Sequence, residues 1–198
     1  MEKNYKGKPL YDALLESEMT PGIFKVSLVS NPATEIGWVA FSKTKQNFAI
    51  VSEDQHKVIS VIMLANHPIY RRTSDGFEYY IQFSPETLYE ASKRMLANGF
   101  QNMVNLQHTE GTDIEGFELT QIYQKDLAKG INPTGFEEVE EGSLFGEYYV
   151  SNDEIWDEIK KGTFSGISLE GIFDVEPHQE ETVIDSIEDL LDYLDISK

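Results

Sequence analysis

The sequence contains no cysteine, which removes several classes of protein at once. Without cysteine there is no disulfide scaffold, no thiol nucleophile and no cysteine-ligated zinc site. No apolar run reaches the roughly 18 residues that a membrane-spanning helix needs. The longest run, residues 57–65, suits a buried strand, and the polar residues 1–11 do not resemble a signal peptide. We therefore expect no contact with a membrane.

Basic residues are also scarce, at 16 against 35 acidic residues, which gives 198 residues a net charge of −19. Such a surface repels phosphate backbones, so we expect no nucleic-acid partner. Residues 137–141 and the stretch from 174 onward carry much of the excess. A solvated surface with an acidic tail is the simplest interpretation.

Several cofactor motifs are missing. The four histidines, at positions 56, 67, 108 and 178, do not have the spacing of a zinc hydrolase. The chain has neither a phosphate-binding glycine loop nor a dinucleotide fingerprint, and it lacks the Gly-x-Ser-x-Gly elbow of α/β-hydrolases. We expect no cofactor and no metal.

Alternating and β-branched runs predict a chain built mainly of strands, with few helices. Strands are expected at 24–29, 36–41, 58–64, 69–71, 77–83, 104–107, 114–123, 144–150 and 164–175. Helices are expected after the capping residue Ser84, over 152–161, and, as an acidic amphipathic helix, over 183–194. The predicted fold class is α+β, a mostly antiparallel β-barrel core flanked by short helices. We divide the chain into an N-terminal extension (1–22), one folded domain (23–176) and an acidic C-terminal tail (177–198).

One candidate for chemistry is His108, at the end of the strand expected over 104–107. With a period of two, Val104, Leu106 and His108 share an apolar face. A partly buried imidazole there can act as a base near neutral pH, or it can be a structural histidine bonded to a backbone carbonyl. The pattern leaves both interpretations open.

The second candidate is Ser168, which the pattern places on the face opposite Ile167 and Leu169. Gly166 and Gly171 on either side would leave room for another backbone, as a peptide substrate requires. A serine becomes a nucleophile when a base takes its proton, and His108 is the best-placed base. The other interpretation is that Ser168 is simply the polar side of an edge strand.

These segments together resemble the XkdF-type family of phage prohead serine proteases. The matching segments are 26–33, 41–43, 67–72, 75–84, 102–108 and 166–171, so the resemblance covers about residues 24–174. It implies a prohead maturation protease with the fold of the herpesvirus assemblins, a β-barrel ringed by helices. It also implies that His108 is the base and Ser168 the nucleophile.

The resemblance further implies the partners and the place of action. Phage scaffold protein and major capsid protein would be substrates, inside the assembling prohead in the host cytoplasm, and self-cleavage is common in such enzymes. Whether the chain forms a homo-oligomer is left open. A catalytically inactive head-assembly protein that retains the protease fold is the alternative function, and an acidic binding module or nucleic-acid mimic is a third that rests on charge alone.

The third member of the catalytic group is less well specified. Herpesvirus relatives use a second histidine, and carboxylates are common in phage members. We favour Glu170, which shares the face of Ser168, over His178 and Asp75. The assemblins also hold the oxyanion with an arginine pair after the serine, but here no arginine follows Ser168, so backbone N–H groups near Gly166 or Gly171 would have to serve.

Overall fold

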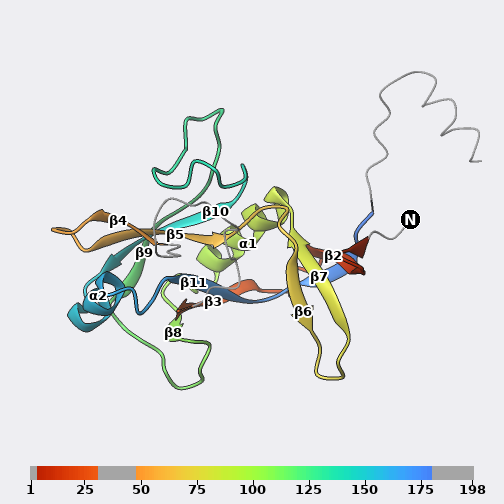
Figure 1. The fold of residues 1–198 in the computed structure, drawn as a ribbon, viewed down its shortest axis with the longest axis horizontal. Coiled ribbons are helices and arrows are strands. Elements are labelled where there is room, and N and C mark those ends of the chain that lie inside the picture. The colour runs from red at the N-terminus through yellow and green to blue at the C-terminus, as the bar shows by residue number, and fades with distance from the viewer. Residues whose placement is uncertain (1–3, 31–47, 180–198) are drawn as a thin grey trace, which may run out of the picture.

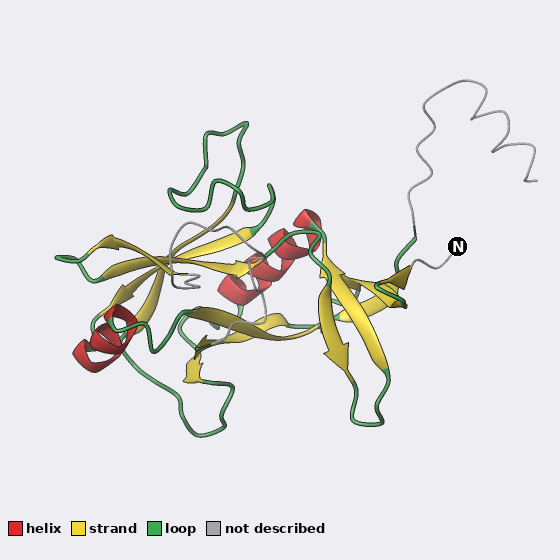
Figure 2. Cartoon of the chain, viewed as in Figure 1, coloured by secondary structure: helices red, strands yellow, loops and turns green. Residues whose placement is uncertain are grey.

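A computed structural model describes residues 4–30 and 48–179 of the chain. The predicted strand at 36–41 and the predicted helix at 183–194 lie outside these residues. Within them the protein is mostly β, with three sheets and two short helices (Figures 1 and 2). No helix in the described ranges is long and apolar enough to cross a membrane.

The largest sheet has five strands in the order β1-β2-β7-β6, with β12 also paired to β2. The strands are β1 (Asn4–Tyr5), β2 (Lys8–Leu14), β6 (Ile69–Arg72), β7 (Glu78–Phe83) and β12 (Asp174–Pro177). β2 runs parallel to β7 and antiparallel to β12. Residues 4–14, which the sequence assigned to an extension, thus join a sheet, and Ala13 is 1% exposed.

The second sheet has four antiparallel strands in the order β4-β5-β10-β9. They are β4 (Phe48–Ser52), β5 (Lys57–Met63), β9 (Phe117–Gln124) and β10 (Leu144–Val150). β10 is one of the two inner strands, and most of its side chains are buried; Leu144, Phe145 and Tyr148 are fully buried.

The third sheet has the order β11-β3-β8, with β3 (Gly22–Val29), β8 (Val104–Leu106) and β11 (Gly166–Ile172). β3 lies between an antiparallel β11 and a parallel β8. The fully buried Val26, Leu28 and Ile167 share a core cluster with Val58 and Ile62 of β5. One face of this sheet is therefore fixed against the core.

Local sequence signals place both helices where they were predicted. α1 (Pro85–Ala97) begins after Ser84, whose hydroxyl accepts from the Thr87 amide. α2 (Asp153–Lys160) begins after Asn152, whose side chain accepts from the Glu154 and Ile155 amides. α1 packs against β3 and also contacts β9 and β10.

The predicted barrel is wrong for the described residues, because none of the three sheets closes. The run 164–175 was expected to be one strand. It divides at Phe173 into β11, which pairs with β3, and β12, which pairs with β2 in another sheet. β11 and β12 thus belong to two different sheets and do not close a single sheet into a barrel. The order of β runs in the sequence does not show this division.

Candidate functional site

A polar face of the three-stranded sheet carries the candidate site. In the antiparallel pair of β3 with β11, Ser168 lies opposite Ser27 and Glu170 lies opposite Lys25. In the parallel pair of β3 with β8, Asn105 lies beside Ser27. Paired residues project from the same face of a sheet, so these side chains lie together. As predicted, Ser168 and Glu170 share a face opposite Ile167 and Leu169.

His108 reaches this polar face because the chain reverses at the end of β8. The strand stops at Leu106, and both Gln107 and His108 adopt left-handed backbone angles, with φ of 53° and 54°. Thr112 helps to hold the turn, since its hydroxyl contacts the backbone of Leu106 and Thr109. The prediction that His108 shares the apolar face of Val104 and Leu106 is therefore wrong. Such backbone angles in non-glycine residues cluster at functional sites.

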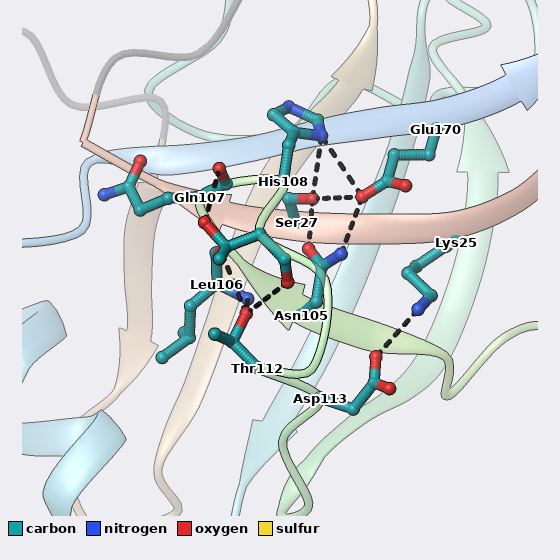
Figure 3. Close-up of polar contacts among 10 residues, drawn as sticks. Lys25, Ser27, Asn105, Leu106, Gln107, His108, Thr112, Asp113 and Glu170 are labelled. Carbon is teal, nitrogen blue, oxygen red and sulfur yellow. Dashed lines mark hydrogen bonds and ion pairs between the residues drawn. The ribbon is translucent and has the colours of Figure 1, made fainter.

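The imidazole of His108 takes part in a compact hydrogen-bond network (Figure 3). Its Nδ1 lies 3.2 Å from Glu170 Oε1 and 2.9 Å from Ser27 Oγ. Ser27 Oγ lies 2.7 Å from Glu170 Oε1, and Asn105 Nδ2 donates to the same oxygen at 2.8 Å. The Ser27 hydroxyl also contacts Asn105 Oδ1. Among the described residues, both hydrogen bonds of the ring are made by Nδ1, and none involves Nε2.

Glu170 is the acceptor on which this network converges. Burial by itself would raise the pKa of Glu170, but hydrogen bonds from Ser27, Asn105 and His108 outweigh it and hold the pKa below its ordinary value. Its side chain is 25% exposed and that of His108 is 42% exposed. At neutral pH the site therefore contains a carboxylate paired with a partly accessible imidazole.

The two serines of the site have different surroundings. Ser27 is fully buried and bonded into the network, whereas Ser168 is 7% exposed. Within residues 4–30 and 48–179, no hydrogen bond joins the Ser168 hydroxyl to His108. The structure thus brings His108 and Glu170 into contact and places Ser168 on the same face, with no hydrogen bond to His108 among the described residues.

Ser27 and Asn105 are site residues that the sequence interpretation missed. Ser27 is the one hydroxyl in the apolar stretch 26–29, and Asn105 interrupts the apolar residues Val104 and Leu106. Single polar residues of this kind are the available signal, because a buried polar side chain needs a partner. What sequence could not supply is the strand register that makes these residues neighbours.

The expectation that Gly171 leaves room for a substrate backbone is wrong. A Cβ at this position would lie 2.5 Å from the Phe173 ring and 2.8 Å from the Gly22 carbonyl oxygen. The space beside Gly171 is filled by the protein itself, so the glycine serves close internal packing.

The other two candidates for a third member lie elsewhere. His178 Nδ1 contacts Asp12 Oδ2 at 2.7 Å and Gln82 Nε2 at 3.1 Å, on the five-stranded sheet. Asp75 lies in the turn between β6 and β7, where the Thr73 hydroxyl and the Phe77 amide hold its pKa below the ordinary value. Neither residue hydrogen-bonds to His108, and Glu170 does.

No arginine contributes to the network around His108. Arg94 on α1 donates to the carbonyl oxygens of Leu15, Ser17 and Thr20, and Arg71 and Arg72 lie on β6. The cation on the polar face is Lys25, which pairs with Asp113 at 2.7 Å.

No protein-family model, curated protein or solved structure matches the chain. The family resemblance of its motifs remains a prediction.

Proposed function

We propose that the chain is a serine endopeptidase of the prohead-maturation type, with His108 as base, Glu170 as the group that orients it and Ser168 as nucleophile. The observation that carries the proposal is the contact between Glu170 Oε1 and His108 Nδ1 at 3.2 Å. A carboxylate on Nδ1 leaves Nε2 as the nitrogen that can take a proton from a hydroxyl. This is the division of roles in Ser-His-acid hydrolases.

Ser168 suits the role of nucleophile better than Ser27. Ser27 is fully buried, so a substrate carbonyl cannot approach its oxygen. It also contacts Nδ1, the nitrogen that Glu170 occupies. Ser168 retains 7% exposure on the same face. A contact between the nucleophile and the base often tightens only when substrate binds, so a hydrogen bond between Ser168 and Nε2 is not required in the free enzyme.

The proposed reaction is ordinary acyl transfer. Ser168 Oγ attacks the scissile carbonyl carbon while its proton passes to His108 Nε2, and Glu170 stabilises the imidazolium that forms. The imidazolium then protonates the leaving amine, and an acyl-enzyme remains. Water then attacks the acyl carbon while His108 takes its proton. The imidazolium returns that proton to Ser168 Oγ as the acid is released. Backbone N–H groups would hold the oxyanion, since the described arginines lie elsewhere.

Scaffold protein and major capsid protein are the substrates that we propose, cleaved inside the assembling prohead in the host cytoplasm. This part of the proposal comes from the motif resemblance in segments such as 102–108 and 166–171. Self-cleavage belongs to the same proposal.

Processing of co-expressed scaffold and capsid protein tests the enzyme directly. Ser168→Ala should abolish the cleavage. Ser165→Ala is the matched control, because Ser165 is also 7% exposed and its hydroxyl bonds instead to the Ser30 carbonyl at 2.7 Å. Loss of cleavage in both variants, or in neither, would count against Ser168 as nucleophile.

A non-enzymatic head-assembly protein is the second candidate. The observation in its favour is that, in the described part of the chain, His108 is bonded to Ser27 and Glu170 but not to Ser168. Such a network also joins β3, β8 and the neighbouring β11, which a purely structural role would explain. A serine-directed phosphonate separates the two candidates: it labels Ser168 in an enzyme and leaves an assembly protein unlabelled.

A further inference from the structure

The hydrogen bonds around His108 include the side-chain amide of Asn105, which has one donating and one accepting end. Glu170 is ionised, and a carboxylate can only accept hydrogen bonds. Asn105 must therefore present its NH₂ group to Glu170, which agrees with the distance of 2.8 Å from Nδ2 to Oε1. The carbonyl oxygen Oδ1 of the same amide is then the end that faces Ser27.

The hydroxyl of Ser27 lies between Asn105 and His108. It has one proton and three neighbours: Asn105 Oδ1, Glu170 Oε1 and His108 Nδ1. The two oxygens accept only, and Nδ1 is the one neighbour that can donate. If Ser27 gave its proton to Nδ1, both oxygen–oxygen contacts would lack a proton. The favourable arrangement directs the Ser27 proton to an oxygen and leaves its lone pair toward Nδ1.

His108 is the last member of this hydrogen-bond network. Its Nδ1 faces Ser27 Oγ at 2.9 Å and Glu170 Oε1 at 3.2 Å, and both act as acceptors toward it. We propose that Ser27 and Asn105 are positioning residues that hold the neutral imidazole of His108 in the tautomer with its proton on Nδ1. This tautomer exposes the lone pair of Nε2.

The consequence for catalysis rests on the proposed function, but the tautomer itself does not. In the protease, Ser27 and Asn105 keep Nε2 ready to accept the proton of Ser168. Ser27 is then no nucleophile, because its proton is directed to an oxygen. Its loss should lower kcat/KM about tenfold, which is the value of one hydrogen bond to the imidazole, with KM little changed.

The imidazole nitrogens of the full-length chain report the tautomer by NMR after labelling histidine with ¹⁵N. The spectra are recorded where the imidazole is neutral, and His108→Gln identifies the His108 signals. In the wild type we expect Nδ1 at the position of a protonated nitrogen and Nε2 at that of an unprotonated one. In Ser27→Ala and Asn105→Ala both nitrogens should move part of the way toward the averaged position of a mixed population, because Glu170 remains as an acceptor for Nδ1, and Ser27→Thr should keep the wild-type pattern.

Two controls accompany the spectra. Ser60→Ala removes another fully buried hydroxyl, one that bonds to the Val61 carbonyl, and it should leave His108 unchanged. The signals of His178, which is paired with Asp12 on another sheet, should stay constant in every variant. If Ser27→Ala does not fold, the spectra of the wild type and Asn105→Ala still test the inference.

A wild-type His108 with its proton on Nε2, or a wild-type pattern that neither Ser27→Ala nor Asn105→Ala changes, would overturn the inference. Failure of the proposed function gives a different pattern. In that case the wild type and Ser168→Ala would process substrates alike, or neither would process them, while the proton of His108 remained on Nδ1.

Discussion

Ser27 on β3 and Ser168 on β11 lie directly opposite each other in an antiparallel pair, and their hydroxyl groups do not share the same surroundings. Ser27 is fully buried and contacts Asn105, His108 and Glu170. Ser168 is 7% exposed. Both serines are buried, but Ser27 is bonded to the imidazole of His108 and Ser168 is the one that retains some exposed surface.

This difference predicts unequal effects on stability. Ser27→Ala should lower the free energy of unfolding by about 1–2 kcal/mol, because Asn105 and Glu170 lose a buried partner. Ser168→Ala should change it by less than about 0.5 kcal/mol, because no hydrogen bond within the described ranges is lost. Urea unfolding of both variants measures the difference. Equal losses would contradict the distinct roles of the two serines.

Glu170 should make stability depend on pH on the acidic side. Its pKa in the folded protein is below the ordinary value, so its contribution is present above the pKa of the unfolded chain. The contribution is lost as the pH falls through the lower, folded pKa. Glu170→Gln should therefore flatten the fall in unfolding free energy between neutral and acidic pH, measured by urea titration at several pH values. A slope as steep as that of the wild type would contradict the assignment.

The same substitution should reduce activity. A glutamine at position 170 no longer stabilises the imidazolium of His108, so kcat/KM should fall by on the order of a hundredfold or more. Cleavage of a peptide taken from the processed capsid segment measures the effect. Glu147→Gln, on β10, is a control that should retain activity, because Glu147 faces Lys57 and not His108.

His178 should matter for the fold and not for the reaction. Its contacts with Asp12 of β2 and Gln82 of β7 hold the residue after β12 against the five-stranded sheet. His178→Gln should cost about 1 kcal/mol of stability and leave processing intact, as thermal unfolding and the cleavage assay will show. Loss of processing in a folded His178→Gln protein would favour His178 as the third catalytic member.

We predict a larger loss of stability when Lys125, which lies away from the site, is replaced. It is 3% exposed, and its Nζ donates to the carbonyl oxygens of Phe136, Glu137 and Val139. Lys125→Met leaves these three acceptors without the donor and should cost about 3 kcal/mol, measured by chemical unfolding. Lys129→Met, at an exposed pair with Asp126, is the control and should have little effect.

The sequence predicted the features that local interactions determine, such as where the helices begin and which face of a strand a side chain occupies. Ser84 caps the first helix as expected, the second helix lies within the predicted range 152–161, and the alternation in 166–171 placed Ser168 and Glu170 on one face. His108 was assigned to the wrong face because two successive left-handed residues, neither of them a glycine, end the alternation of β8.

The remaining differences come from pairing between distant segments. The contact of Ser27 with Glu170 joins residues 143 positions apart, and the register of β3 with β11 creates it. The division of 164–175 between two sheets depends likewise on β2, which is far away in the chain. Periodicity gives the face of a side chain, but not its neighbour across a strand pair.

Mass spectrometry of the chain co-expressed with its capsid and scaffold proteins tests the central claim most directly, with wild type, Ser168→Ala and Ser165→Ala compared side by side. The account predicts cleaved products in the wild type and in Ser165→Ala and none in Ser168→Ala. Cleaved products at the wild-type level in Ser168→Ala would contradict it.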